Sequence, residues 1–401
     1  MKQHELMQKK YLIVNTGSAS KKYAFYKDEE RVYTAHFEME NGSPIVTEFF
    51  DDKKEKTEIT KKNYVEAINF IIGSLVKNKI IEKKSDIDSV GIRIVAPGDY
   101  FLTNRLIDKE YMKLAKVALK KVPLHLGPAL EEIKTIRKSF GEKFPIYGVS
   151  DSAFHSTIPD HGRLYAIPIN DSRKLGLKMF GYHGISVQSV VSKAEKTLGN
   201  LPEKIVVCHL GGGGSVTAVK NGQSIDTSMG FTPLPGLVMA TRVGDIDAGA
   251  ILYLSEKLKK GPRKMEKYLN NECGLLGLSG KSSDIRELLQ YEKDGHEDSA
   301  LALRVYVNRV KQQIGKMSAI LGGLDLLILA GTVGERSFIM RDRICKDMEF
   351  LGIEIDNEIN DKSEGVEIEI SKKDSKAKVL IVKTDEMEEI AKETLRLSKE
   401  K

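Results

Sequence analysis

A glycine-rich stretch carries the strongest chemical signal in the sequence. Residues 205–208 are β-prone, His209 follows them, and Gly211 to Gly214 are four consecutive glycines before a second β-prone run. Such a loop lets the backbone approach a ligand closely with its N–H groups turned outward, and phosphate is the usual ligand. A glycine-rich hairpin without a ligand has the same pattern, so this stretch alone leaves both interpretations open.

A second loop of the same kind lies near the N-terminus. Residues 11–14 read as a buried strand, residues 15–20 form a turn rich in small hydroxyl side chains, and Lys22 begins a returning strand. Hydroxyl groups beside a lysine suit a phosphate or a hydrated Mg²⁺. Two similar loops in two halves of one chain predict a duplicated domain with the ligand between the copies.

Two arginines lie in settings that favour an anionic partner. Arg93 interrupts the apolar run 90–95, and a buried arginine needs an anion because an unpaired buried charge is unfavourable. That anion is either a ligand carboxylate or phosphate, or a core Asp or Glu. Arg242 lies in a loop of small residues, 239–247, which fits anion binding better than core packing.

Histidine and aspartate complete the candidate chemistry. His183 stands between two glycines at the expected start of a helix, where it either reaches a ligand or is held by a local backbone bond. Asp151 and His155 are four residues apart and would share a helix face, which suits a metal pair or simple capping by Asp151.

Strands and helices with clear patterns must position these residues. Asn221-Gly222 predicts a two-residue hairpin turn. Apolar spacing predicts helices over 63–77, 127–139 and 300–321, and one that begins at Gly184. A serine at 282 or 283 is expected to cap another helix, and Asp385 with Glu388 forms a helix-start box. The buried strand 325–330 ends at GTVGERS, the layout of a nucleotide-contacting loop without the GxGxxG pattern.

Composition describes a globular protein with two domains. The chain has 401 residues, more than one core usually holds, with 41% apolar and 30% charged residues. Its net charge of +6 is scattered, so no nucleic-acid track is expected. Three distant cysteines give neither a disulfide framework nor a metal spacing. With no leader-like or membrane-spanning segment in view, we expect a cytoplasmic protein.

Taken together, these motifs resemble the acetate kinase family within the actin, Hsp70 and sugar-kinase superfamily. The match runs in uninterrupted order from about Tyr11 to Ala391. Its densest segments are VNTGSASKKY, SDSAFHSTIP, GYHGIS, CHLGGGGSVTAVKNGQSIDTSMGFTPLPGL, GLLGLSGKSSDIR, GTVGERS and TDEMEEIA. The segment GQSIDTSMGFTPL and the order of the motifs are highly specific, whereas a single glycine loop is not.

The resemblance implies an α/β fold of two duplicated ribonuclease H-like (actin-like ATPase) domains that flank a central cleft. Residues 1–153 plus 384–401 would form the N-terminal acyl kinase domain, completed by the C-terminal helix, and residues 154–383 the nucleotide-binding domain. It also implies a homodimer and the reaction of ATP with acetate, or another short-chain carboxylate, to give ADP and acyl phosphate, with Mg²⁺ or Mn²⁺.

The resemblance also implies a role for individual residues. The catalytic group would be Asp151, His183 and Arg242. The metal would be handled by Asn15 and Glu386. The acyl substrate would meet Arg93, Val95, Leu124, Tyr182 and Pro233. The nucleotide would meet Lys22, His209, Leu210, Gly211, Gly212, Gly213, Asp284, Ile285, Arg286, Thr332, Val333, Gly334, Glu335 and Arg336.

Four departures from the family pattern keep alternatives open. Gly212 replaces the usual Asn of the phosphate loop, and Tyr182 replaces a Phe, which leaves acetate or propionate as the substrate. Thr332 and Arg336 stand where the family has Gly and Asn. Side chains there would crowd adenine, which leaves pyrophosphate as an alternative phosphoryl donor to ATP. A non-catalytic nucleotide switch of the actin or Hsp70 type is a remote alternative, because it has no need for all the charged catalytic residues.

Overall fold

The computed structural model describes residues 8–17, 20–40 and 42–400. The N-terminal residues 1–7 and residues 18–19 of the predicted phosphate-type turn lie outside the described residues. The chain forms two compact units. Unit 1 comprises Met1–Ala153 and Asp385–Lys401, and unit 2 comprises Phe154–Thr384.

Unit 1 is built on one eight-stranded sheet with the order β5-β4-β3-β2-β1-β6-β8-β7. β1 is parallel to β6, β6 is parallel to β8, and the other neighbours are antiparallel. The strands are β1 (Lys10–Thr16), β2 (Ser20–Lys27), β3 (Glu30–Glu40), β4 (Ser43–Phe50), β5 (Lys53–Glu58), β6 (Ser89–Ile94), β7 (Arg105–Leu106) and β8 (Ile146–Ser150).

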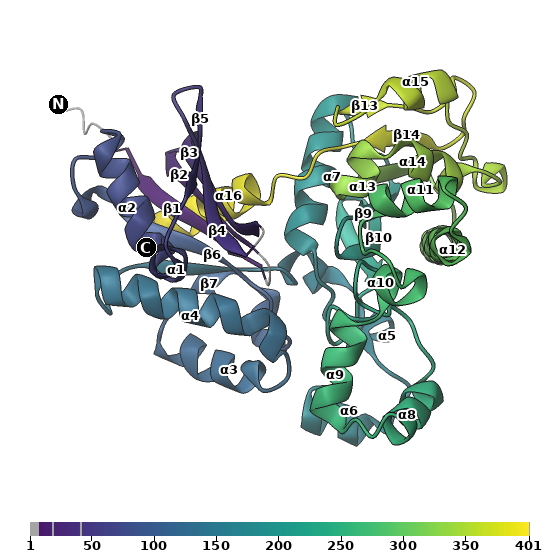
Figure 1. Ribbon diagram of the computed structural model, residues 1–401, viewed down its shortest axis with the longest axis horizontal. Helices are drawn as coiled ribbons and strands as arrows, with labels where there is room; N and C mark the ends of the chain where they lie inside the picture. The colour runs from purple at the N-terminus through teal and green to yellow at the C-terminus, as the bar shows by residue number, and fades with distance from the viewer. Residues whose placement is uncertain (1–7, 18–19, 41, 401) are drawn as a thin grey trace. The chain divides into compact units, whose positions relative to one another are not determined.

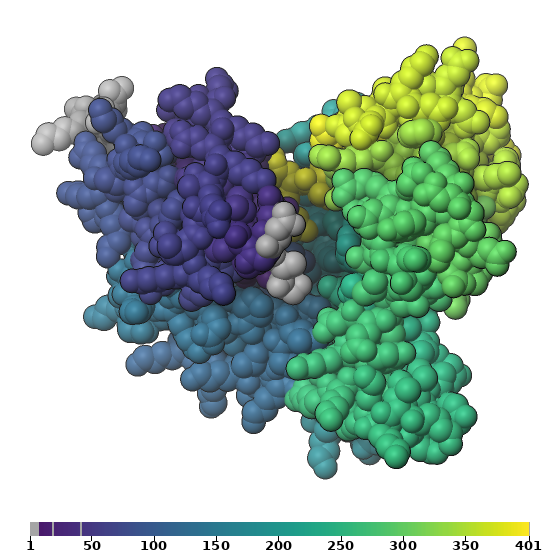
Figure 2. Space-filling model, in the orientation of Figure 1, coloured from purple at the N-terminus to yellow at the C-terminus, as the bar shows by residue number. Residues whose placement is uncertain are grey.

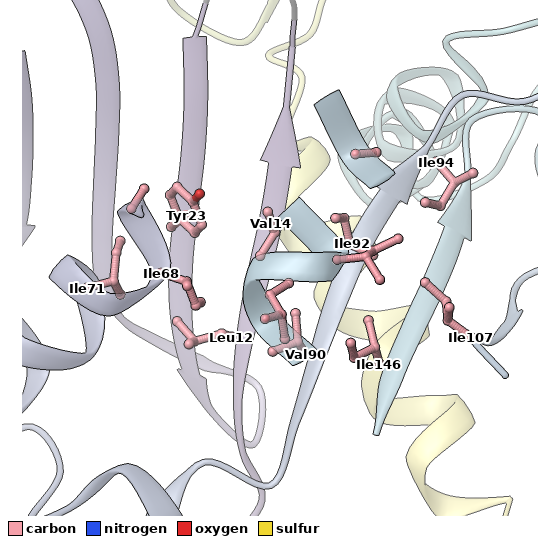
Figure 3. Packing of buried hydrophobic residues seen from close by; sticks show 14 of the residues in the cluster. Leu12, Val14, Tyr23, Ile68, Ile71, Val90, Ile92, Ile94, Ile107 and Ile146 are labelled. Atoms are coloured by element: carbon pink, nitrogen blue, oxygen red, sulfur yellow. The ribbon is translucent and has the colours of Figure 1, made fainter. Parts of the chain in front are cut away.

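Helices cover both faces of this sheet. The main core joins alternate side chains of β1 and β6, such as Leu12 and Ile92, to α2 and α4 (Figure 3). The opposite face packs on α16, where a side chain at Gly91 would collide with Thr394. The helices of unit 1 are α1 (Lys61–Val65), α2 (Ala67–Lys77), α3 (Lys109–Leu119), α4 (Pro123–Phe140) and α16 (Glu386–Lys399), with 3₁₀ turns at Lys84–Asp86 and Asp99–Leu102.

Unit 2 holds a six-stranded sheet with the order β11-β10-β9-β12-β14-β13. β9, β12 and β14 are mutually parallel, β10 is antiparallel to β9, and β11 is antiparallel to β10. The strands are β9 (Lys204–Leu210), β10 (Gly214–Lys220), β11 (Gln223–Thr227), β12 (Leu326–Ala330), β13 (Ile368–Glu369) and β14 (Lys378–Ile381).

The faces of the second sheet are again both covered. α7 packs through Val187 and Val190 on one face, and the long α12 packs on the other (Figure 1). Figure 2 shows the segments around residues 250–300 and 330–370 as one continuous surface. The helices are α5 (Asp160–Arg163), α6 (Ile169–Leu175), α7 (Gly184–Leu198), α8 (Ala248–Lys257), α9 (Pro262–Asn271), α10 (Gly274–Ser279), α11 (Ile285–Lys293), α12 (Glu297–Leu321), α13 (Gly331–Arg336), α14 (Phe338–Cys345) and α15 (Asn357–Lys362), with 3₁₀ turns at Ala153–Thr157 and Glu349–Leu351.

The two sheets share one topology. In each, an antiparallel meander of three strands (β1-β2-β3 or β9-β10-β11) is extended on its first strand by two parallel strands, β6-β8 or β12-β14. The same order and the same strand directions in both units confirm the predicted fold class, an α/β protein of two duplicated ribonuclease H-like domains.

Several predicted elements are confirmed and two are corrected. The Asn221-Gly222 turn joins β10 to β11 with positive φ at both residues, and Asp385 caps α16 by accepting from the N–H of Glu388. The helix expected over 63–77 is instead two helices, because the backbone leaves helical geometry at Glu66. The expected serine cap is wrong, because Asp284 accepts the capping bond of α11. No helix in the described part of the chain is long and apolar enough to cross a membrane.

Candidate active site

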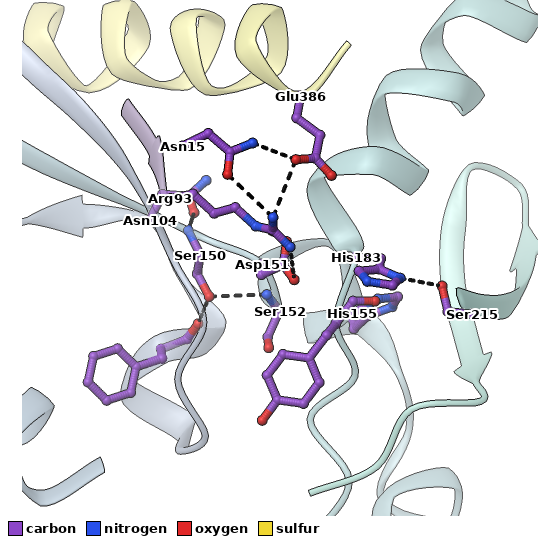
Figure 4. A network of polar contacts seen from close by, with 12 residues as sticks. Asn15, Arg93, Asn104, Ser150, Asp151, Ser152, His155, His183, Ser215 and Glu386 are labelled. Atoms are coloured by element: carbon purple, nitrogen blue, oxygen red, sulfur yellow. Dashed lines mark hydrogen bonds and ion pairs between the residues drawn. The ribbon is translucent and has the colours of Figure 1, made fainter. Parts of the chain in front are cut away.

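Arg93 is held by a buried carboxylate in unit 1. It lies on β6, and Asp151 follows the neighbouring parallel strand β8, so both residues lie at the carboxyl ends of these strands. The guanidinium Nε and Nη2 each donate to one oxygen of Asp151 at 2.9 Å (Figure 4). Burial alone would lower the pKa of Arg93, but the charges of Asp151 and Glu386 outweigh it and raise that pKa. The guanidinium is therefore a fixed cation.

The remaining nitrogen of Arg93 faces two oxygen-bearing side chains. Its Nη1 lies 3.4 Å from Asn15 Oδ1 and 3.4 Å from Glu386 Oε2. Asn15 Nδ2 donates to the same Glu386 oxygen at 2.6 Å. Asn15 comes from β1 and Glu386 from the first turn of α16, so the terminal helix delivers its carboxylate to the strand ends of the first domain. Four predicted residues thus form one network in unit 1.

The chemistry of this network suits a magnesium ion. Glu386 and Asn15 offer oxygen donors, which Mg²⁺ prefers, and one carboxylate is enough where substrate phosphates and water complete the shell. Among the described residues no group of three or more His, Cys, Asp or Glu could hold a metal by itself. Lys22 pairs in register with Asn15 on β2, and its side chain is exposed.

His183, Arg242 and the glycine loop come together in unit 2. His183 precedes α7 in a left-handed conformation, and its Nδ1 lies 3.1 Å from Ser215 Oγ at the start of β10 (Figure 4). A Cβ added at Gly213 would lie 3.3 Å from the His183 ring and 3.6 Å from a guanidinium nitrogen of Arg242. A side chain at Gly213 would therefore fit only if the imidazole moved by a few tenths of an ångström.

The loop that carries Arg242 is tied to the glycine loop by backbone bonds. Ala240 N–H donates to the carbonyl of Gly212 at 3.1 Å, and Arg242 donates through Nη1 to the carbonyl of Pro233 at 3.1 Å. The loop has no regular secondary structure, as predicted, and its shape is fixed by these contacts. A cation and an imidazole at the edge of a glycine loop suit a phosphoryl group.

Asp151 and His155 do not act as a pair on one helix face. Asp151 precedes the 3₁₀ turn Ala153–Thr157 and binds Arg93, whereas His155 is fully buried in unit 2. The His155 ring lies 2.8 Å from Ser224 Oγ and 2.9 Å from the carbonyl of Tyr182. The buried histidine thus supports the backbone immediately before His183.

A cavity of about 480 Å³ in unit 2 gathers most of the predicted nucleotide residues. Three predicted segments far apart in the sequence contribute to its lining: the glycine loop, the start of α11 and the short helix α13. The predicted residues among the lining are Gly211, Gly212, Asp284, Ile285, Arg286, Thr332, Val333 and Arg336. Asp284 pairs with Arg286 at 2.6 Å, and the hydrogen bond from Arg286 lowers the pKa of that carboxyl.

The remaining predicted nucleotide residues of unit 2 have other surroundings. His209, Leu210, Gly213, Gly334 and Glu335 are not among the lining residues. The cavity also has lining that the sequence reasoning missed: Leu275, Ser283, Leu289, Gln290, Lys293, Ser337, Phe338, Ile339 and Glu364. Helical spacing was the usable signal for two of them, because Leu289 and Lys293 follow Ile285 by one and two turns of α11.

The four residues predicted to line an acyl pocket come from both units. Val95 and Leu124 belong to unit 1, and both are partly buried. Tyr182 and Pro233 belong to unit 2, where Tyr182 is fully buried and its hydroxyl donates to the carbonyl of Phe231 at 2.7 Å. Their joint role stays a prediction.

Comparison with known proteins decides the family. The model of the Acetokinase family matches residues 10–392. The chain belongs to the acetokinase family. Acetate kinase of Bacteroides thetaiotaomicron is 38% identical over 398 residues, which cover 97% of this chain and 100% of that protein. Acetate kinase of Clostridium novyi is 39% identical, with 96% of this chain and 97% of that protein covered.

Solved structures of acetokinase relatives share the fold. Acetate kinase of Porphyromonas gingivalis superposes with a TM-score of 0.87 at 33% identity, covering 97% of this chain and all of that one. A propionate kinase of Francisella tularensis gives 0.88 at 32% identity, covering 96% and 98%. This likeness over nearly the whole chain confirms the predicted family resemblance and the predicted fold class.

Proposed function

We propose that this acetokinase family member catalyses the reversible transfer of a phosphoryl group from ATP to acetate, giving ADP and acetyl phosphate. Its membership makes it a phosphotransferase with a carboxyl group as acceptor. The observation that carries the choice of phosphoryl donor is the cavity of about 480 Å³, which the glycine loop and two other predicted nucleotide segments line.

The cavity favours ATP over pyrophosphate as the donor. Its volume lies within the range of about 300–1,000 Å³ that is typical of small-molecule sites. Apolar side chains, including Leu275, Ile285 and Phe338, supply a surface for a base, for which pyrophosphate has no use. Thr332 and Arg336 are exposed and leave this volume open, so the expected crowding of adenosine is not supported.

The acceptor needs alignment more than activation. A carboxylic acid with a pKa near 4 is ionised at pH 7, so it is already a nucleophile. Two anions must be brought into line, and the charge on the transferring group must be balanced. We assign Arg93 to the acetate carboxylate, with Asp151 fixing its orientation, and assign Arg242 and His183 to the phosphoryl group. Direct in-line transfer needs no covalent enzyme intermediate.

Asn15 and Glu386 would hold Mg²⁺ on the donor phosphates. When bound, the ion neutralises negative charge on the phosphate oxygens. The residues of the chain orient it: Glu386 supplies the carboxylate, and Asn15 and Arg93 fix the position of its oxygen. The methyl group of acetate would meet Val95, Leu124, Tyr182 and Pro233. The three cysteines, all unpaired, suit a reducing cytoplasm.

Exposed apolar side chains on α6 and α8 of unit 2 support a homodimer. α8 has no buried residue, and its Leu252 and Tyr253 are 73% and 62% exposed. Ile169 and Leu175 of α6 are also exposed, and α6 and α8 lie at the same end of unit 2 in Figure 1. Exposed large apolar side chains on two helices are typical of an interface, and we assign this surface to a second copy of the chain.

The proposed reaction is tested by trapping its product. Purified protein with Mg·ATP and acetate is expected to give an acyl phosphate that hydroxylamine converts to a hydroxamate. The same assay with pyrophosphate in place of ATP, and with propionate in place of acetate, tests the two alternatives. No product with either donor and either acid, together with measurable nucleotide binding, would support a non-catalytic switch instead.

A further inference from the structure

One carboxylate in unit 2 joins two segments that lie far apart in the sequence. Glu335 Oε1 accepts from the N–H of Gly331 at 3.1 Å and from the N–H of Thr384 at 3.1 Å, and the Thr384 hydroxyl lies 3.4 Å away. The resemblance assigns Glu335 to the nucleotide, but its side chain is engaged with backbone and is not among the lining residues of the cavity.

The first of these segments is the nucleotide loop. Gly331 begins α13, whose Thr332, Val333 and Arg336 line the cavity. Gly331 has φ +74°, and a Cβ there would lie 2.7 Å from the carbonyl oxygen of Leu210. The start of α13 is therefore packed on the end of β9, where the glycine loop begins. By accepting from the N–H of Gly331, Glu335 holds the start of α13 in this contact with the glycine loop.

The second segment, Lys383 to Asp385, is where the chain passes from unit 2 back to unit 1, and it is called the crossing segment below. Thr384 is the last residue of unit 2, and Asp385 is the first residue of the returning part of unit 1. Asp385 caps α16 and pairs with Arg31 at 2.9 Å, and Glu386 bonds to Asn15. Two residues span at most about 7 Å, so Glu386 lies within that distance of Thr384 along the chain.

A neighbouring carboxylate makes a similar contact without reaching the nucleotide loop. Glu367 Oε1 accepts from the N–H of Lys383 at 3.1 Å and from Lys193 Nζ at 2.9 Å. Glu367 and Glu335 thus hold adjacent residues of the same crossing segment. Of the two, Glu335 alone is also bonded to Gly331 in the described structure.

We propose that Glu335 is a positioning residue that couples occupancy of the nucleotide cavity to the Glu386–Asn15–Arg93 network. The proposal rests on the proposed function, since it takes the cavity as the nucleotide site and Arg93 as the acetate site. A ligand that shifts the α13 loop changes the Glu335 contacts, and the same oxygen holds Thr384. Charge-assisted bonds of this kind are about twice as strong as neutral ones, so the linkage resists stretching.

Thermodynamic linkage gives the measurement. If nucleotide and acetate sites are coupled, acetate changes the affinity for ADP, and typical coupling factors are about 5–150-fold. ADP and acetate do not react with each other, so both can be present at equilibrium. We titrate Mg·ADP into the intact protein in a calorimeter, with and without saturating acetate. The coupling factor is the ratio of the two ADP dissociation constants, and we expect it to be at least about fivefold.

Substitutions at Glu335 and Glu367 then separate coupling from support of the fold. Glu335→Ala is expected to bring the factor below about twofold, and Glu335→Gln, whose amide oxygen still accepts, to give an intermediate factor. Glu367→Ala is expected to keep the wild-type factor. Thermal melts identify any variant that fails to fold, and in that event Glu335→Gln decides.

The outcomes for coupling and for function are distinguishable. An active wild type with a factor of one, or a factor that Glu335→Ala and Glu335→Gln leave unchanged, overturns the coupling and leaves the proposed function intact. Equal loss of the factor in Glu367→Ala overturns the specific role of Glu335. A wild type that neither binds Mg·ADP nor forms acyl phosphate overturns the proposed function itself.

Discussion

At the scale of single residues, Arg93 has the buried acidic partner that one of the two sequence interpretations required, and its binding of a ligand stays a prediction. Its Nε and Nη2 are paired with Asp151, as expected of a core arginine. Its Nη1 points to a polar network with Asn15 and Glu386, which is where a ligand-binding arginine is expected. Asp151 orients the guanidinium and leaves Nη1 facing this network, so the ion pair is compatible with the proposed binding of an anionic substrate by Arg93.

Asp151→Asn is expected to weaken both the fold and the reaction. Asp151 is fully buried, and loss of one partner from a buried ion pair removes about 3–5 kcal/mol of stability. A guanidinium that is no longer held in place lowers kcat/KM for acetate by about 10²-fold. Urea unfolding and steady-state kinetics measure the two effects.

The control for this substitution is an exposed ion pair in the same unit. Arg137 pairs with Glu142 at 2.9 Å, but the Glu142 side chain is 83% exposed. Glu142→Gln is expected to change stability by less than about 1 kcal/mol and to leave kinetics unchanged. If Asp151→Asn loses stability but keeps the wild-type kinetics with acetate, Asp151 supports the fold alone.

At the scale of elements, the candidate site residues lie where parallel strands end. β12 leads directly into α13, and β9 leads into the glycine loop. Because these neighbouring strands are parallel, α13 and the glycine loop lie together at the carboxyl ends of the strands. The corresponding edge in unit 1 carries Asn15 on β1, Arg93 on β6 and Asp151 after β8. This repeated arrangement explains why residues far apart in sequence meet within each unit.

Gly331→Ala tests the close packing of these two loops. The positive φ and the carbonyl of Leu210 leave no room for a methyl group, so we expect about 1–3 kcal/mol lower stability and weaker ADP binding. Gly315→Ala within α12 is the matched control, because its φ is ordinary and nothing lies within 4 Å. That change is expected to raise stability by about 0.5–1 kcal/mol. Equal behaviour of the two variants would contradict the packing argument.

At the scale of the whole molecule, the main property is duplication, and the proposed homodimer is the main prediction. Each unit has its own core. The terminal helix belongs to unit 1, although in the sequence it follows the whole of unit 2. Neither property is visible in any single motif. The exposed apolar side chains of α8 belong to this scale, because no contact within the described chain buries them.

Leu252→Asp is expected to convert a dimer into a monomer. A charge at a residue that is 73% exposed in one copy is compatible with the fold but not with an apolar interface. Size-exclusion chromatography with light scattering measures the mass of wild type and variant. Val65→Asp is the control, since Val65 is 63% exposed on α1 of unit 1. A monomeric wild type, or a dimeric Leu252→Asp variant, would contradict the proposed interface.

The sequence by itself determined the local features of this protein. Strand runs, the Asn221-Gly222 turn and the cap at Asp385 depend on near neighbours and on backbone preferences, which act over a few residues. Motif order then predicted the family and the fold class. The misplaced serine cap and the helix break at Glu66 show the limit of this local reasoning, because several nearby residues could satisfy the same pattern.

Only the tertiary structure decided which distant residues share a partner. The pairing of Arg93 with Asp151, the contact of Gly213 with His183 and the bond from Thr384 to Glu335 join segments that are 30 to 58 positions apart in sequence. No spacing rule predicts such contacts, because they depend on strand order and on the close approach of backbones. Side-chain charge and type suggested the chemistry, and packing determined which of the candidate groups lie together.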